Sequence, residues 1–429
     1  MECEMISMEK IKPASATPHH LRIYKISLLD QLVLHAYASV ILFFSGSSGG
    51  SSLQHLKDSL SQTLATFYPL AGVVRDALSV DCNDQGLVFY VAKVKGEIRD
   101  FLQNPNIELM NKFLPGGCNP EKPPCPGDNV MVIRLNCFDC GGIAMSIMFD
   151  HCVADLNSIS TFLRCWAANA RGCDQVSTLN CIAQSSFPQK PSLPRNLVPV
   201  YNLMKYWSVG KFVMRRYVFN ASALSILKAE LSSGGATPSR VDVVTAVIWK
   251  SFMAAAAADS AGKPFLMSHA VNLRRRAAPP FPDDSFGNFL WVATAVCSNP
   301  EEELKELVWE GKKEIRKIDG EFVRRVEGGC LEKWRNEMPE EGKWICFTSW
   351  ANMGVYEVDL GWGKPVWVSR NVWDESHKET MFPNEMVTLI DTRDGRGIEA
   401  WIILNHKYVA AFEKNDEIVK YAQVNPAAL

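Results

Sequence analysis

The chain has 429 residues, of which 47% are hydrophobic and 21% are charged. These proportions are typical of a soluble globular protein, and the length exceeds what a single core usually supports, so two domains are expected. The formal net charge of −2 creates no overall field that would attract nucleic acid or an anionic membrane, and we expect neither as a partner.

The beginning of the chain and its cysteines indicate a cellular compartment. Residues 1–5 are acidic and no apolar core with a small-residue cleavage site follows them, so no signal peptide is expected. Thirteen cysteines are an odd number, which favours reduced thiols and a cytoplasmic location. Cys137 and Cys140 form a lone CxxC pair, without a second pair at zinc spacing. We interpret them as small buried side chains and expect no metal site.

Apolar periodicity predicts the elements of the first half. A Ser/Gly-rich stretch, 45–52, has the composition of a flexible loop. A Gly pair precedes the β-prone run 143–148, and apolar residues at helical spacing begin after His151, so a buried strand should lead directly into a helix. The other elements expected here are a strand at 40–44, an amphipathic helix at 53–66 and a strand at 87–91.

The second half begins after a proline-rich stretch, 185–200, which is typical of a linker between domains. Ser239 and Asp242 have the spacing of a capping box, which predicts a helix start. Strands and helices neither alternate strictly nor separate into blocks, so two layered α/β or α+β units are expected. The other elements predicted here are strands at 216–219, 266–273 and 289–296, helices at 221–231 and 301–327, and a hairpin formed by 387–391 and 398–404.

An ionisable pair lies where the strand 143–148 leads into its helix. His151 and Asp155 are four residues apart, about one helical turn. A histidine in an ordinary environment is largely neutral at pH 7 and accepts a proton from a hydroxyl, so His151 is a candidate general base. The same spacing also occurs by chance in many helices. Asp155 either orients the imidazole or turns away to pair with an arginine, for which Arg274 is a candidate.

A second motif suggests different chemistry. The run Gly46-Ser47-Ser48-Gly49-Gly50 formally matches the G-x-S-x-G nucleophile elbow, with Ser48 as the nucleophile. Its Ser/Gly composition explains the match, and such a slack loop does not form the tight turn that an elbow requires. A serine hydrolase therefore remains a distant alternative. No phosphate-cradling glycine motif follows a predicted strand.

Two motifs together resemble those of a known family. His151-Cys152-Val153-Ala154-Asp155 and Asp359-Leu360-Gly361-Trp362-Gly363 are similar, in order and separation, to the HxxxD and DFGWG motifs of the plant BAHD acyl-CoA-dependent acyltransferases. The resemblance extends from about residue 20 to the end of the chain, and it is strongest to the branch that acetylates alkaloid alcohols. The other stretches that agree are 24–30, 67–72, 272–274, 286–288 and 348–350.

The resemblance implies an α/β fold of two similar-sized mixed-sheet domains joined by a long crossover, with a solvent channel between them. Acyl-CoA would enter from one face and the acceptor from the other. We expect an N-terminal domain over 1–184, a crossover linker over 185–215, and a C-terminal domain over 216–429 that carries the CoA contacts and the Asp359 turn. Acyl-CoA, above all acetyl-CoA, is expected as a co-substrate of a cytoplasmic monomer, with no tightly bound cofactor.

The resemblance also implies roles for individual residues. Asp155 is expected to turn from the channel and pair with Arg274, and Thr348 lies where a donor stabilises an oxyanion. Asp359 matches a position that is counted among the family's functional residues, although its glycine-rich surroundings indicate an architectural turn. Leu360 stands where the family usually has Phe. The implied catalytic set is His151, Asp155, Asp359, Thr348 and Trp350; the implied cofactor contacts are Ser239 and Arg240, at the 3′-phosphate end of CoA, and Asn288.

The implied reaction is acyl transfer to a hydroxyl of a plant specialised metabolite, with an alkaloid as the expected acceptor. His151 would remove the hydroxyl proton while the oxygen attacks the thioester of a CoA bound in the same complex. A malonyl or larger acyl donor and a terpenoid or phenolic acceptor are the alternatives. A malonyl group would require an arginine beside the acyl pocket, and the sequence does not place one there.

Overall fold

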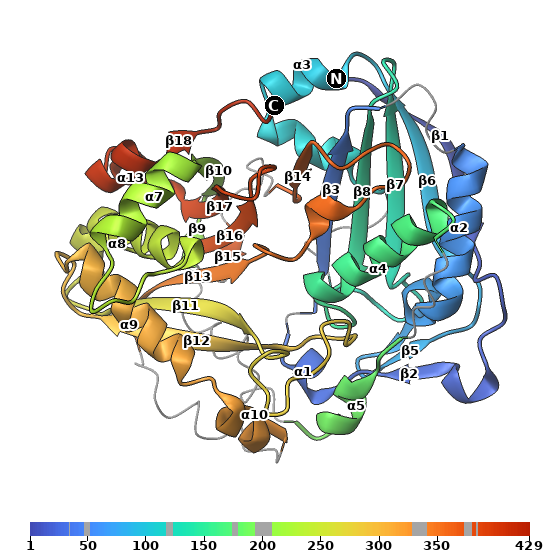
Figure 1. Ribbon diagram of the computed structural model, residues 1–429, viewed down its shortest axis with the longest axis horizontal. Coiled ribbons are helices and arrows are strands. Elements are labelled where there is room, and N and C mark those ends of the chain that lie inside the picture. Colours follow the sequence, from blue (N-terminus) through green and yellow to red (C-terminus); the bar gives the residue numbers. More distant parts are fainter. Residues whose placement is uncertain are drawn as a thin grey trace.

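The computed structural model describes residues 1–33, 35–46, 52–116, 123–173, 179–193, 208–327, 341–372, 380–382 and 385–429. Two large mixed sheets face each other across the molecule (Figure 1). This arrangement confirms the expected α/β fold with two mixed-sheet halves. Ser48 lies outside the described residues.

The first sheet is built mainly from the first 150 residues. It is antiparallel except where β6 and β7 run parallel. The predicted helix 53–66 is α2 (Leu53–Thr66), which packs with α4 (Leu156–Ala170). The strand order is β1 (Cys3–Ile11), β6 (Leu87–Val94), β7 (Met131–Phe138), β8 (Ile143–Asp150), β3 (Tyr37–Phe44) and β14 (Trp367–Ser369). A smaller sheet contains β2 (Ile23–Lys25), β5 (Ser79–Asp81) and β4 (Val73–Asp76).

The second sheet belongs to the C-terminal half. The predicted hairpin is the antiparallel pair of β16 (Glu385–Asp391) and β17 (Ile398–Asn405). The strand order is β12 (Leu290–Cys297), β11 (Phe265–Asn272), β13 (Lys343–Ser349), β16, β17, β10 (Phe212–Phe219) and β18 (Gln423–Val424). β9 (Ser208–Gly210) and β15 (Thr380–Phe382) form a separate pair.

The helix α8 (Arg240–Ser260) packs in the core of the second half. The capping box predicted from Ser239 and Asp242 is present at its start. Its length and hydropathy would suffice to cross a membrane, yet 61% of its apolar stretch is buried inside the protein. This burial accounts for its composition. The other helices are α1 (Leu28–Gln31), α3 (Ile98–Gln103), α5 (Ile182–Ser186), α7 (Ala221–Glu230), α9 (Leu304–Arg316), α10 (Gly320–Glu327), α12 (His406–Glu413) and α13 (Asp416–Tyr421).

The single long helix predicted over 301–327 was wrong, because the chain divides there into α9 and α10. Between them Ile318 is buried in a core cluster, and the Asp319 carboxylate accepts a hydrogen bond from the backbone N–H of Phe322 at 2.9 Å. A buried apolar side chain followed by a capping acid favours a new helix start over a continuous helix.

One segment of the C-terminal half lies on the first sheet. β14 pairs with β3, so the chain after the Asp359 turn adds the last strand to the sheet built by the N-terminal half. Leu360 and Trp362 belong to the same core cluster as Phe43 and Phe44. The turn that the sequence assigned to the 216–429 domain therefore packs against the N-terminal half.

Among the described residues the two halves contact each other at several places, including two apolar ones. At one, Trp367 of the first sheet lies 6.0 Å from Trp401 of the second sheet, centroid to centroid. At the other, Leu28 and Leu29 share a core cluster with Phe187 and Phe289. These two apolar contacts fix the halves relative to each other. Part of the crossover, 194–207, lies outside the described residues.

Candidate active site

His151 occupies the junction between β8 and α4. Its backbone N–H donates to the carbonyl of Ala36 at 3.0 Å, and its own carbonyl accepts from the Asn288 side chain at 2.7 Å. The ring is half-buried, and its Nδ1 has no hydrogen-bond partner among the described residues. Nδ1 is buried as well as unpaired, so it does not meet a substrate in this structure, and the ring nitrogen left to accept a proton is Nε2.

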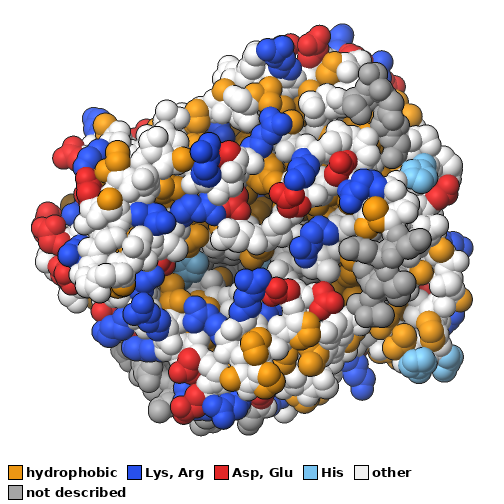
Figure 2. Space-filling model, in the orientation of Figure 1, with side chains coloured by type: hydrophobic (Ala, Val, Ile, Leu, Met, Phe, Trp, Pro, Cys, Tyr) orange, Lys and Arg blue, Asp and Glu red, His pale blue; other side chains and the backbone are white. Residues whose placement is uncertain are grey.

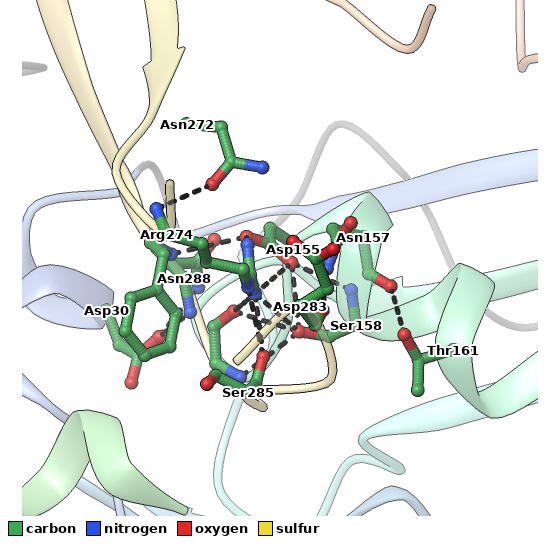
Figure 3. A network of polar contacts seen from close by, with 12 residues as sticks. Asp30, Asp155, Asn157, Ser158, Thr161, Asn272, Arg274, Asp283, Ser285 and Asn288 are labelled. Atoms are coloured by element: carbon green, nitrogen blue, oxygen red, sulfur yellow. Dashed lines mark hydrogen bonds and ion pairs between the residues drawn. The ribbon is translucent and has the colours of Figure 1, made fainter. Parts of the chain in front are cut away.

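Asp155 forms the predicted ion pair with Arg274 (Figure 3). The guanidinium donates from Nη1 to Oδ2 at 2.7 Å and from Nη2 to Oδ1 at 3.0 Å, so the pair is bidentate. Arg274 is 1% exposed, and its guanidinium lies 4.6 Å from the centre of the Phe289 ring. Asp155 also caps α4 by accepting from the N–H of Ser158 at 2.8 Å. The carboxylate is thus fully engaged and does not orient the imidazole.

The charge on Asp155 is stabilised by these partners. Burial alone would raise the pKa of this carboxyl, but the Arg274 guanidinium and the N–H groups of Ser158 and Phe289 together hold the pKa below its ordinary value. A folded-state pKa below the unfolded value stabilises the protein at pH values above the unfolded one. Asp155 therefore fixes the loop that carries His151 as a charged, structural group.

Asn288 was expected to contact the cofactor, but the structure places it in the interior with no exposed surface. Its Nδ2 donates both to the Asp30 carboxylate at 2.8 Å and to the carbonyl of His151 at 2.7 Å. Its backbone N–H donates to the same carboxylate oxygen of Asp30 at 2.7 Å. Asn288 thus connects the second half of the chain to the backbone of the candidate base and acts as a positioning residue.

Sequence analysis missed Asp30 as part of this network. Burial raises the pKa of its carboxyl to about 6, against the lowering effect of the hydrogen bonds from Ser27 and Asn288. Ser27 and Asp30 form a complete capping box at the start of α1, a spacing that is visible in the sequence. That signal indicates a helix start, but it carries no information about the distant partner Asn288.

Replacing Asn288 with alanine should lower the kcat for acyl transfer by about tenfold or more and leave KM nearly unchanged. The substitution removes the hydrogen bond that holds the His151 carbonyl. It also leaves a buried Asp30 oxygen with fewer donors, and losing such a donor costs about 1–3 kcal/mol in the free energy of folding. Initial rates at varied substrate concentrations separate the two constants. Asn157→Ala is the matched control, because Asn157 donates to a backbone carbonyl at an exposed site. Equal losses in both variants would contradict the positioning role.

Thr348 and Trp350 lie at the C-terminal end of β13 and just beyond it. Both side chains are half-buried, and the N–H of Trp350 donates to the carbonyl of Leu389 at 2.7 Å. Trp350 lines a cavity of about 350 Å³. The other residues that line this cavity include Asn352, Tyr356, Val368, Ile390, Asp391 and Gly395.

Ser239 and Arg240 lie near the rim of the same cavity. The Arg240 guanidinium forms an ion pair with Asp391 at 3.0 Å and donates to the carbonyl of Gly397 at 3.1 Å. It therefore ties the start of α8 to the β16–β17 hairpin. Ser239 is exposed, and its hydroxyl accepts the capping hydrogen bond from Asp242. Arg240 thus contacts Asn352, Asp391 and Gly395, which line the cavity together with Trp350.

Asp359 forms the turn indicated by its glycine-rich surroundings. Its Oδ1 accepts from the N–H groups of Gly361 at 2.9 Å and Gly363 at 3.0 Å, and both glycines have positive φ angles. The adjacent Leu360 is fully buried, and the ring of Trp362 packs edge-on against Phe44 at 5.4 Å. These contacts give Asp359 an architectural role in holding the segment before β14.

The sequence around His151 also contains a second ionisable pair. Asp150 is 2% exposed, and its Oδ2 lies 3.4 Å from Nε2 of His35. The thiol of Cys152 lies within 4.8 Å of these two donor groups. The other oxygen of Asp150 already accepts from the Cys152 N–H at 3.0 Å. The Cys152 thiol itself donates to the Val33 carbonyl at 3.8 Å, so each of the three groups has a protein partner and we interpret them as a local structural cluster beside the base.

Comparisons with known proteins agree with this architecture. The model of the Transferase family matches residues 1–419. A limonoid 7-O-acetyltransferase of Citrus sinensis is 36% identical over the full length of both chains, and stemmadenine O-acetyltransferase of Catharanthus roseus is 35% identical over 94% of both. The solved structure of vinorine synthase is 31% identical, covers both chains fully and has a TM-score of 0.82.

A more distant likeness concerns the fold alone. TRI101 of F. sporotrichioides, solved in complex with coenzyme A and T-2, is 17% identical, covers 94% of this chain and 99% of its own, and has a TM-score of 0.71. The family model, the relatives and the fold together place the chain among the two-domain acyltransferases. The chain belongs to the Transferase family, that of the BAHD acyl-CoA-dependent acyltransferases.

Proposed function

We propose that the chain transfers an acetyl group from acetyl-CoA to a hydroxyl of a polycyclic alkaloid or limonoid alcohol. The observation that carries this proposal is the half-buried His151 side chain at the junction of β8 and α4, whose backbone is held from both halves of the chain. The relatives support the acetyl donor and both acceptor classes, since they include named limonoid and alkaloid O-acetyltransferases.

The proposed mechanism uses His151 as the general base. The imidazole takes the hydroxyl proton as the oxygen attacks the thioester carbonyl, and the tetrahedral intermediate collapses with loss of the CoA thiolate. The protonated imidazole then returns its proton to that sulfur, so the enzyme ends in its starting state. Thr348, which donates to no described residue, is the proposed donor to the oxyanion. Both substrates are bound together, and no covalent acyl-enzyme forms.

The cavity beside Trp350 is the proposed entrance for CoA. Figure 2 shows a hollow near the centre of one face, between the two halves, with several Lys and Arg side chains around it. The Lys and Arg side chains around this hollow suit the phosphates of CoA, because clustered positive charge raises the local concentration of an anionic substrate. The charged residues that line the cavity beside Trp350 are Arg393, Glu357, Asp391 and Asp394. Arg240 and the start of α8 lie beside the cavity, which supports the contact with the 3′-phosphate that the resemblance implies.

The remaining expectations about the setting are also proposals. We propose that the protein acts as a monomer, as the resemblance implies. We propose a cytoplasmic location, which is supported by the odd number of cysteines in the sequence.

Incubating the purified protein with acetyl-CoA and a panel of alkaloid and limonoid alcohols should yield acetyl esters, detected by product mass. Without an alcohol, acetyl-CoA should be stable and the protein mass unchanged. Ser48→Ala should retain full activity, because the serine hydrolase alternative predicts an acyl-serine instead. Accumulation of acetylated protein without acceptor, lost in Ser48→Ala, would contradict the direct transfer.

A further inference from the structure

The face of the second sheet that lies toward the first sheet changes character across its width. On β17 this face carries Trp401, and on β16 it carries Met386 and Ile390, which pack in the core cluster shared with the first sheet. The residues between them, such as Val387 and Leu389, pack on the opposite side, in the core that contains α8. Thr388 therefore points toward the first sheet.

Polar side chains replace the apolar contact on this face beyond Trp401. Thr388 is paired in register with Trp401 on one side and with Thr348 of β13 on the other. Thr348 is half-buried and is the proposed oxyanion donor. Across the neighbouring strands β17, β16 and β13, this face therefore changes from the packed Trp401 to Thr348 at the proposed reaction site. Thr388 marks the boundary between them.

Arg370 reaches this boundary from the first half of the molecule. It follows β14, and the next residue, Asn371, is held by Ser39 of β3 through its N–H at 3.1 Å and its Oδ1 at 3.0 Å. The Arg370 side chain then extends to the second sheet, where Nη1 donates to the Thr388 hydroxyl. Nε donates to the carbonyl of Asn371 at 3.3 Å. The guanidinium thus bridges the two sheets from a fixed backbone.

No carboxylate of the described residues lies within ion-pair distance of Arg370. Arg370 is half-buried. Two fully buried arginines differ from it in having a carboxylate partner, since Arg216 pairs with Glu399 and Arg274 pairs with Asp155, each at 2.7 Å. Burial lowers the pKa of Arg370 to about 10, which still leaves it charged at neutral pH. A cation held in the interior without an anion is costly. A bidentate carboxylate would compensate for that cost.

The position of Arg370 is next to a ligand passage. Val368, two residues before it, and Ile390, two residues after Thr388, both line the cavity beside Trp350. We propose that Arg370 forms an anion subsite that binds a carboxylate group of a substrate, with Thr388 holding the guanidinium in place. This inference rests on the proposed acyl transfer. The carboxylate belongs either to a dicarboxylic acyl donor, such as malonyl-CoA, or to an acidic acceptor.

Two sets of measurements distinguish these sources. The first compares kcat/KM and equilibrium binding for malonyl-CoA and acetyl-CoA, and the second compares acceptors that carry a carboxylate with their methyl esters. In one of the two sets, Arg370→Met should lower the ratio of kcat/KM for the anionic substrate to kcat/KM for the neutral one by about 10–100-fold. This is the size expected for losing charge-assisted hydrogen bonds. Arg370→Lys should restore part of that ratio.

Arg325→Met is the matched control, because it removes one arginine that pairs with Glu321 on the surface of α10. It should leave both ratios unchanged. Arg370→Met should not lower the melting temperature, since it removes a half-buried charge that has no ion-pair partner among the described residues. If the substitution lowers the melting temperature and lowers kcat/KM equally for all substrates, Arg370 only joins the two halves and the inference fails. An unchanged ratio in both sets also overturns it. Equilibrium binding of the substrates needs no turnover, so it distinguishes a failure of the anion subsite from a failure of the proposed acyl transfer.

Discussion

His151→Ala should lower kcat for acetyl transfer by about 10²–10⁴-fold, the usual contribution of a general base. The substitution removes the group that takes the hydroxyl proton, while the backbone contacts of residue 151 to Ala36 and Asn288 do not depend on its side chain. The melting temperature should therefore change little. The measurement is single-turnover acetylation of a saturating acceptor, followed by product mass, so that product release does not mask the chemical step.

Two controls make this result specific. His19→Ala removes an imidazole from the exposed surface and should retain full activity. Added imidazole should restore part of the rate in His151→Ala, because a small base can occupy the vacated space beside the loop. If His151→Ala keeps more than a tenth of the normal rate with an intact fold, the proton is removed by another group and the mechanism is wrong.

Local chemistry made several elements of the fold predictable from the sequence. The capping boxes at Ser27 and Ser239 and the strand-to-helix junction at His151 depend on residues within a few positions of one another. The helix predicted over 301–327 was wrong because its division depends on Ile318 packing into a core cluster shared with residues such as Leu28 and Phe187. No spacing within the helix itself records that contact.

The long-range contacts of the site were beyond local patterns. Asp155 and Arg274 are 119 residues apart, and the pair was expected chiefly because the two residues match positions in a known family. The burial of Asn288 and the place of Arg370 both depend on how the two halves meet. Arg370 reaches the second sheet only because β14 has crossed to β3. The sequence analysis found no arginine for an acidic acyl group for the same reason.

Arg274→Met should destabilise the protein by about 3–5 kcal/mol at neutral pH and greatly reduce activity. Removing one partner of a buried ion pair leaves the other as an uncompensated charge, and here Asp155 also caps α4 and sets the loop of His151. Chemical denaturation measures the first effect, and acetyl transfer at a temperature where the variant is folded measures the second.

The pH dependence of this loss has a definite sign. In the wild-type protein the pKa of Asp155 is held below its ordinary value, so its stabilising effect is complete above the unfolded value of about 4 and is lost as the pH falls through the folded value. Without Arg274, burial dominates and raises the pKa of Asp155. The variant then gains protons on folding, so the stability difference between the two proteins should shrink as the pH is lowered from 7 to 4.

Asp155→Asn combined with Arg274→Met separates the charge from the geometry. The double variant carries no buried charge at this place, so it should be more stable than Arg274→Met alone, as expected when a buried pair is removed together. Activity should not recover to the same extent, because without the guanidinium nothing ties the loop of His151 to residue 274, although the Asn side chain can still cap α4. A double variant that recovers stability and activity together would show that charge neutrality alone matters, and that the position of His151 does not depend on this pair.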